Sequence, residues 1–257
     1  MNKIGIASTT PPERGFHTLT VQATALLTPG MRRIRFGGTG SAMLVAKYPA
    51  GWIKLFLDSG GLASMVGRAY TIRRFDSAAN AIDIDFVIHG EGPLSRWAEQ
   101  ALPGDLVHGV GPRGGYCPPE DIRHHILMGD ASAIPAMSSI IEALPSGMSV
   151  DAFIEVAADT ERQAIRSSAT ATFHWLVRPV GQPSGQLLIE AARALQPAPG
   201  SFVWVAAESN IVKVMRQHFI GQCGIDRRRL SASGYWKRNA LDYRDPDADW
   251  TLSLIHI

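Results

Sequence analysis

Residues 126–144 have the sequence ILMGDASAIPAMSSIIEAL, which predicts a strand that passes directly into a helix. The first three residues form a short apolar run. After Gly129, apolar residues recur at helical spacing, and Pro135 lies near the first turn, where its missing N–H costs little. The expected apolar face of this helix contains Ile134, Met137, Ile140, Ile141 and Leu144. A strand followed at once by a helix is typical of α/β domains.

The same alternation continues towards the C-terminus. Further short apolar runs occupy residues 150–156, 173–177, 202–206 and 230–233. One intervening segment has Leu188, Ala191, Ala192 and Leu195 on a single helical face, and another begins at Ser209, an expected N-cap, and runs to about Ile220. Repeated strand, helix and strand predict a doubly wound parallel sheet that binds its ligands at the carboxyl ends of the strands.

The first half of the chain has a period of two instead. Residues 82–88 place Ile82, Ile84, Phe86 and Ile88 on one face of a strand, and Asp83 and Asp85 on the other. The same alternation is expected of Leu19, Val21, Ala23 and Ala25, and of Ile53, Leu55 and Leu57. Because Gly and Pro clusters separate these runs, the pattern indicates an antiparallel β-barrel or sandwich.

The change of period near residues 118–123 predicts two domains. We expect an antiparallel β-barrel domain over residues 1–121 and an α/β doubly wound domain over residues 122–251. The last six residues, LSLIHI at 252–257, have no cap, turn or periodic relation to what precedes them. They match the translation of a transposon end used to tag sequencing libraries, so we expect adapter read-through there. The alternative is a short genuine strand.

Composition and charge narrow the classes of function. The formal net charge is only +2, from 25 basic and 23 acidic residues, which argues against nucleic acid as a partner. Residues 1–12 lack the features of a secretory signal, and no apolar run approaches the roughly 20 residues of a membrane helix. We therefore expect a cytoplasmic protein without stable membrane insertion, and a monomer. Cys117 and Cys223 are not spaced as a metal or disulfide motif, so both are expected to be free thiols and no metal site is predicted.

Two segments of the first half have residue types that suit a phosphate-bearing aromatic cofactor. The string RAYTIR at residues 68–73 closes a glycine-rich loop. A guanidinium can bind phosphate oxygens bidentately, and a hydroxyl can serve a ring nitrogen that gains and loses a proton. The string HGEGPLSRWA at residues 89–98 predicts a glycine-rich turn into a helix around residues 93–100. The amides of Leu94 and Ser95 and the Ser95 hydroxyl could meet a diphosphate there. The plain structural alternatives are a strand with an exposed charge and a helix cap without a ligand.

These strings resemble motifs of the siderophore-interacting protein family, whose members are ferredoxin reductase-like flavoproteins. Further blocks in the same order are GDASAIPA at 129–136, FIEVA at 153–157, AAE at 206–208 and SGYWKR at 233–238. The resemblance covers roughly residues 15–239. It departs from the family at Ala131 and Ser132, where Glu and Thr are usual, and at Asn239, where Gly is usual. The implied fold is an antiparallel β-barrel FAD-binding domain followed by an α/β doubly wound nicotinamide-binding domain.

The resemblance also implies roles for individual residues. Arg68 would pair with the FAD pyrophosphate, Tyr70 would pack against the flavin, and Thr71 would face the reactive edge of the ring. Lys54, Lys237 and Arg238 match basic positions that would attract an anionic ferric chelate and are, with Thr71, the candidate catalytic residues. The remaining cofactor-binding candidates are Ala69, Ile72, Arg73, His89, Gly92, Pro93, Leu94, Ser95, Gly129, Asp130, Ser132, Glu208, Tyr235 and Trp236.

The family's activity would be FAD-dependent reduction of ferric siderophores or other ferric chelates. The electrons would come from NADPH, NADH or, in some members, a ferredoxin, and Arg162 would favour NADPH. Two alternatives remain open from the sequence. One is a flavin or ferredoxin reductase on the same scaffold, and the other is a non-catalytic siderophore-binding protein.

Overall fold

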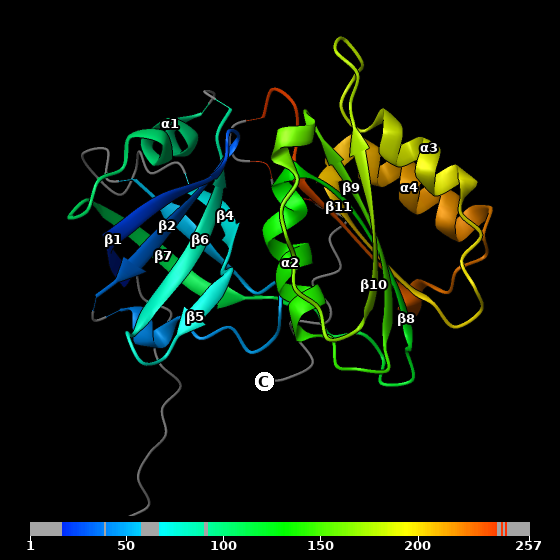
Figure 1. Ribbon diagram of the computed structural model, residues 1–257, viewed down its shortest axis with the longest axis horizontal. Coiled ribbons are helices and arrows are strands. Elements are labelled where there is room, and N and C mark those ends of the chain that lie inside the picture. Colours follow the sequence, from blue (N-terminus) through cyan, green and yellow to red (C-terminus); the bar gives the residue numbers. More distant parts are fainter. Residues whose placement is uncertain are drawn as a thin grey trace, which may run out of the picture.

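The computed structural model describes residues 17–38, 40–57, 67–89, 92–240, 243 and 245. Its two sheets lie side by side, an antiparallel one before a parallel one (Figure 1). Helix α2 (Ile134–Ala143) lies between the two sheets, whereas α3 (Gln186–Ala194) and α4 (Ser209–Gly221) cover the far face of the parallel sheet. Residues 252–257, the suspected read-through, lie outside the described residues.

The first sheet has seven strands in the order β4-β3-β7-β1-β2-β6-β5, and all of its pairings are antiparallel. The strands are β1 (His17–Thr28), β2 (Met31–Gly37), β3 (Trp52–Phe56), β4 (Gly67–Thr71), β5 (Arg74–Asp76), β6 (Ala81–Val87) and β7 (Leu106–Arg113). Helix α1 (Pro93–Gln100) packs over one end of this sheet (Figure 1). The expected antiparallel, barrel-like first half is confirmed.

The alternation in β6 is confirmed, but its polar face is not open to solvent. Ile82, Ile84 and Phe86 are fully buried, and Asp83 and Asp85 on the other face are only 3% and 4% exposed. Their carboxylates are covered by guanidinium groups from neighbouring strands and from the turn between β4 and β5. The pairs are Arg33–Asp85, Arg35–Asp83, Arg74–Asp83 and, from the turn, Arg73–Asp85. Ion pairs with neighbouring arginines, in place of water, therefore surround the two carboxylates on this face.

In β1 the predicted face is only half right. Leu19 and Val21 are buried as expected, whereas Ala23 and Ala25 are exposed. The pairing with β2 shifts its register between Val21 and Ala23, as at a β-bulge. Because one extra residue inverts the alternation of side chains, the second half of β1 turns its alanines away from the core.

The second sheet has five parallel strands in the order β10-β9-β8-β11-β12. They are β8 (His124–Asp130), β9 (Ser149–Val156), β10 (Thr170–Val177), β11 (Phe202–Glu208) and β12 (Leu230–Trp236). Each coincides with a predicted apolar run, so the α/β prediction is confirmed. The predicted N-cap of α4 is wrong by one position. Glu208, not Ser209, is the N-cap, because its carboxylate accepts hydrogen bonds from the first amides of the helix.

Side chains of the second half bind the first half directly. Glu161, which lies between β9 and β10, accepts hydrogen bonds from Thr28 Oγ1 at 2.5 Å and from the Gly30 amide at 2.9 Å. Arg73 donates two hydrogen bonds to Glu142 on α2, at 2.7 and 2.5 Å. These polar contacts fix the two sheets relative to one another, and the site described below contains residues of both.

Both cysteines are free, as predicted. Among the helices that the structure describes, none is long and apolar enough to cross a membrane.

Candidate functional site

The carboxyl ends of three parallel strands meet at the carboxylate of Asp130. Its Oδ1 accepts hydrogen bonds from the Ser132 amide at 2.9 Å and the Ser132 hydroxyl at 2.5 Å. Its Oδ2 accepts from the Trp236 indole nitrogen at 2.8 Å and the Glu208 amide at 3.2 Å. Burial raises the pKa of Asp130, and the hydrogen bonds from Ser132 and Trp236 oppose that shift. Four of the predicted residues therefore form one hydrogen-bonded cluster.

Glu208 connects this cluster to the basic segment after β12. Its Oε2 accepts from the amides of Asn210 at 2.7 Å and Ile211 at 3.3 Å, at the start of α4. Its Oε1 accepts from the Arg238 amide at 3.4 Å. The carboxylate thus helps to hold the backbone beside Lys237.

Gly129 has a packing role that the sequence did not reveal. A Cβ atom at this position would lie 2.5 Å from the Ala133 Cβ and 2.8 Å from the Ala206 carbonyl oxygen. Both distances are shorter than real contacts allow, so no side chain fits between β8, β11 and the turn into α2. The small residue is required by the protein itself, in addition to any need for a close approach of a cofactor.

In the antiparallel sheet, β4 carries four of the predicted cofactor-binding residues, namely Arg68, Ala69, Tyr70 and Thr71. Arg68 Nη2 donates a hydrogen bond to the Ala240 carbonyl at 3.2 Å, 172 positions further along the chain. The ring of Tyr70 lies 4.4 Å from that of Phe86 between centroids, and burial raises the pKa of the Tyr70 phenol. Thr71 is buried at the end of the strand. The Arg68 contact brings the RAYTIR string next to the segment that contains Lys237 and Arg238.

The predicted basic residues are placed on both halves of the molecule. Lys54 lies on β3 opposite the exposed Ala69 of β4, with its Nζ 5.5 Å from the centre of the Phe56 ring. Lys237 directly follows β12, with its Nζ 6.0 Å from the centre of the Tyr243 ring. Arg238 comes next, held through its amide by Glu208.

The N-terminus of α1 is open in front of Gly92. This residue has a φ of 81°, and a Cβ atom built on it would meet nothing within 4 Å. Among the described residues, no side chain caps the helix, and Pro93 occupies its first turn. The Ser95 hydroxyl, predicted to meet a diphosphate, already donates to the Val87 carbonyl at 3.2 Å and accepts from the His89 amide at 3.3 Å. The Leu94 side chain is buried in the core, so α1 offers backbone amides at this end.

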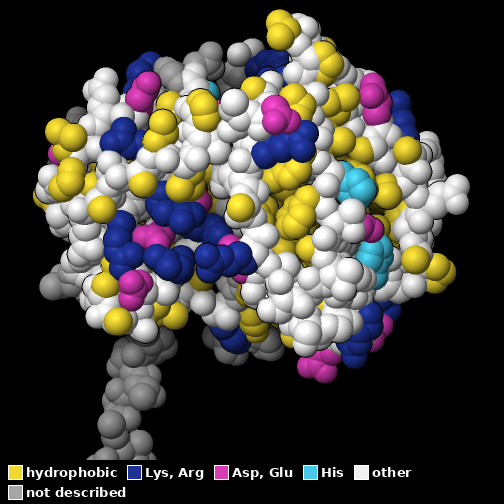
Figure 2. All heavy atoms as spheres, viewed as in Figure 1, with side chains coloured by type: hydrophobic (Ala, Val, Ile, Leu, Met, Phe, Trp, Pro, Cys, Tyr) yellow, Lys and Arg dark blue, Asp and Glu magenta, His cyan; other side chains and the backbone are white. Residues whose placement is uncertain are grey.

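The structure also places the predicted residues Ile72, Tyr235 and Arg73. Ile72 is buried in the core of the first half. Tyr235 packs edge-on against Trp204, with 6.1 Å between ring centroids. Arg73 lines a groove of about 770 Å³ between the two halves. Arg33, Arg74, Arg162 and Arg166 also line this groove. Figure 2 shows the resulting patch of basic side chains where the halves meet.

This arginine cluster was not predicted from the sequence, although the sequence contains a signal for it. Arg33 and Arg35 alternate in the same way as Asp83 and Asp85, and the register of β2 with β6 pairs Arg33 with Asp85 and Arg35 with Asp83. Matching charge alternation on two strands predicts such pairs. No signal pointed to Ala240 or Tyr243, because their contacts are made by chain that follows the last predicted strand.

An antiparallel sheet with the RAYTIR string, followed by a parallel sheet with a polar cluster at its carboxyl edge, defines a ferredoxin reductase-like fold. The fold matches the crystal structure of a ferredoxin NADP+ reductase from Neisseria gonorrhoeae with bound FAD and NADP. The TM-score is 0.64 at 16% identity, over 86% of this chain and 99% of that one.

The chain belongs to the siderophore-interacting protein family. Residues 61–116 match the siderophore-interacting FAD-binding domain, and residues 122–239 match the siderophore-interacting protein domain. The crystal structure of a siderophore utilization protein from T. fusca has a TM-score of 0.82 and 33% identity, over 90% of this chain and 96% of that one.

Two relatives are named as reductases. Ferric vibriobactin reductase ViuB of Vibrio cholerae is 36% identical over 176 residues, which are 67% of this chain and 65% of the relative. Ferric acinetobactin reductase of Acinetobacter baumannii is 28% identical over 187 residues, which are 72% of this chain and 65% of the relative. The aligned region thus spans slightly less than two thirds of the length of both relatives.

Proposed function

We propose that this protein uses FAD to reduce ferric siderophores or other ferric chelates in the cytoplasm, and that the reduction releases ferrous iron. NADPH or NADH would be the electron donor, with a ferredoxin as the alternative. The observation that carries the proposal is the contact of Arg68 with the Ala240 backbone, which brings the flavin motif of one half beside the basic segment of the other. The similarity to two ferric siderophore reductases supports this choice of substrate.

We further propose that residues 1–121 form the FAD-binding domain and residues 122–251 the NAD(P)H-binding domain. In support, β7 ends at Arg113 and β8 begins at His124, so the connection between the two sheets contains the proposed boundary. The polar cluster around Asp130 lies at the carboxyl edge of the parallel sheet, where α/β folds bind nucleotides.

The described residues suit an FAD molecule. Arg68 offers a guanidinium for the diphosphate, and the N-terminus of α1 in the same half offers the amides of Leu94 and Ser95. The Tyr70 ring offers an aromatic surface, and Thr71 offers a hydroxyl. The chemistry that bound FAD would supply is the link between a donor of two electrons, given as hydride, and iron, which accepts one electron.

The remaining proposed roles are those of charged side chains. Lys54, Lys237 and Arg238 would attract an anionic chelate, because opposite charge raises the local concentration of a ligand. Asp130 holds the Trp236 indole, and Glu208 holds the Arg238 amide, so the two carboxylates position the basic segment. No side chain is required as a general acid or base for electron transfer.

Stopped-flow reduction of a ferric catecholate by the FAD-loaded protein tests this proposal. The triple variant Lys54→Gln, Lys237→Gln and Arg238→Gln should lower the second-order rate constant at least about tenfold at low salt, with unchanged FAD content. The control Lys213→Gln, Arg227→Gln and Arg228→Gln removes the same charge elsewhere and should leave the rate unchanged. Equal rates for the two triple variants would reject the basic site.

A second measurement separates the alternatives. Oxidation of NADPH and NADH is followed with ferric catecholate, ferric hydroxamate, free flavin or ferredoxin as acceptor. Faster turnover of free flavin or ferredoxin than of both ferric chelates would favour another reductase on this scaffold. A protein that stays colourless after FAD is added would have no redox role and would fit a siderophore-binding protein.

A further inference from the structure

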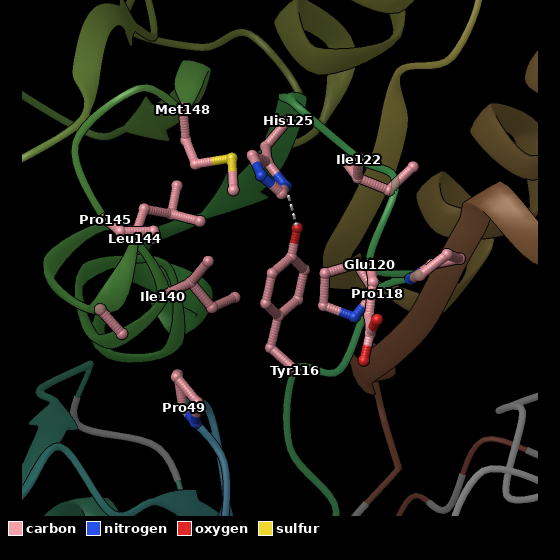
Figure 3. A pocket seen from close by; sticks show the side chains of 12 residues that line it. Pro49, Tyr116, Pro118, Glu120, Ile122, His125, Ile140, Leu144, Pro145 and Met148 are labelled. Carbon is pink, nitrogen blue, oxygen red and sulfur yellow. Dashed lines mark hydrogen bonds between the residues drawn. The ribbon is translucent and has the colours of Figure 1, made fainter.

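A second cavity lies at the opposite end of β8 from Asp130. It has a volume of about 240 Å³ and is lined mainly by apolar side chains (Figure 3). Pro49 comes from the first half, Ile140 and Leu144 from the end of α2, and His125 from the start of β8. An apolar protein cavity of about 150 Å³ can hold benzene, so this one has room for a single ring with a small substituent.

The cavity is also lined by a buried pair of polar side chains, Tyr116 and His125. Tyr116 Oη and His125 Nδ1 are 2.6 Å apart, and His125 is only 2% exposed. Burial raises the pKa of the Tyr116 phenol, and burial together with the neighbouring His124 lowers the pKa of His125 to about 4. Both groups are therefore neutral at pH 7. The phenol hydrogen has His125 Nδ1 as its acceptor, so we assign the proton of the imidazole to Nε2.

That second nitrogen is an unsatisfied donor. Nε2 of His125 is buried and has no hydrogen-bond partner among the described residues. An unpaired buried donor is unfavourable, and such groups in native proteins call for a partner. Met148 lines the cavity together with His125, and in Figure 3 its side chain points towards the imidazole ring. The Met148 side chain is unbranched and flexible, so it can turn aside at little cost and expose Nε2 to the cavity.

We propose that this cavity binds a small neutral aromatic molecule whose carbonyl oxygen accepts a hydrogen bond from His125 Nε2 in place of the Met148 side chain. The apolar wall formed by Ile140 and Leu144 favours a ring. The carboxylate of Glu120, which also lines the cavity, disfavours an anionic ligand. The donor Nε2–H requires an acceptor on the ligand.

This site is separate from the one proposed for the redox reaction. His125 is the second residue of β8 and Asp130 the last, which places them about 17 Å apart at the usual rise of a strand. The ligand would bind between the two halves without touching the Asp130 cluster. The proposal rests on neither FAD nor a siderophore.

The test uses acetophenone as the probe and α-methylstyrene as the matched control, which has the same shape with CH₂ in place of oxygen. Binding to the full chain is measured by NMR, from the Met148 methyl and the His125 imidazole resonances. Acetophenone should bind about three- to tenfold more tightly than α-methylstyrene, as one hydrogen bond allows. Equal affinities, or no saturable shift at millimolar probe, would overturn the proposal.

Two variants should change the affinity in opposite directions. The double variant Tyr116→Phe and His125→Phe keeps two rings but removes the donor. In this variant, acetophenone and α-methylstyrene should therefore bind with the same weak affinity. Met148→Ala uncovers Nε2, so acetophenone should bind several-fold more tightly than it does to the parent protein. Weaker binding to Met148→Ala would contradict the assigned role of His125. Should the double variant fail to fold, the two probes on the parent protein and on Met148→Ala still decide.

Discussion

The indole nitrogen of Trp236 donates a 2.8 Å hydrogen bond to the Asp130 carboxylate, across 106 positions of the sequence. The two residues end β12 and β8, which are not neighbours, because β11 lies between them. The last residue of β11, Glu208, donates its amide to the same oxygen. One buried carboxylate therefore joins the carboxyl ends of three strands and orients the aromatic residue that precedes Lys237.

Trp236→Phe should lower the free energy of unfolding by about 1–3 kcal/mol, because it removes a hydrogen bond to a buried carboxylate. Chemical denaturation of the purified protein measures this. Trp175→Phe makes the same change of volume on β10, where no indole hydrogen bond is described, and is the control. Equal losses for the two variants would show that the Asp130 contact adds no stability.

Arg68→Ala should weaken FAD binding by about 10- to 100-fold, because a charge-assisted hydrogen bond to phosphate contributes about 1.5–3 kcal/mol. Titration of the apoprotein with FAD, followed by quenching of flavin fluorescence, gives the affinity. Arg193→Ala on the exposed side of α3 removes the same charge and should bind FAD normally. Full affinity in Arg68→Ala would remove Arg68 from the cofactor site.

Gly129→Ala should be severely destabilising, because the added methyl group would lie 2.5 Å from Ala133 Cβ and 2.8 Å from the Ala206 carbonyl oxygen. We expect a loss of several kcal/mol, or no soluble protein. Gly221→Ala, at the end of α4, meets nothing within 4 Å and should be neutral or stabilising by up to about 1 kcal/mol. Thermal unfolding of the two variants provides the comparison, and a stable Gly129→Ala protein would contradict the packing described for β8.

Stability should fall as the pH falls from about 6.5 towards 4, because burial lowers the pKa of His125 to about 4. In this window the unfolded chain binds a proton that the folded protein does not, so the free energy of unfolding decreases by up to about 3 kcal/mol. This contribution is fully present above pH 6.5. Denaturant unfolding at several pH values measures it. The double variant Tyr116→Phe and His125→Phe should lose less stability over this range, and parallel curves would contradict the prediction.

The sequence predicted the regular elements of the fold well, since their periods are set locally. The five parallel strands lie where the apolar runs predict them, and α1 has the expected bounds. The two errors concern the buried face of β1 and the N-cap of α4. A bulge in β1 exposes Ala23 and Ala25. Helix α4 already begins at Ser209, so Glu208 is the N-cap and its carboxylate accepts from the amides of the first turn.

By itself, the sequence determined the class of fold and the strings that carry the proposed chemistry, because strand and helix periods and short motifs depend only on neighbouring residues. Only the tertiary structure decided which of these strings meet. The Arg68 contact with Ala240, the Asp130 bond to Trp236 and the burial of His125 beside Tyr116 all join residues from different elements. The physical reason is that such contacts depend on strand order and packing, which place distant residues together without any local signal.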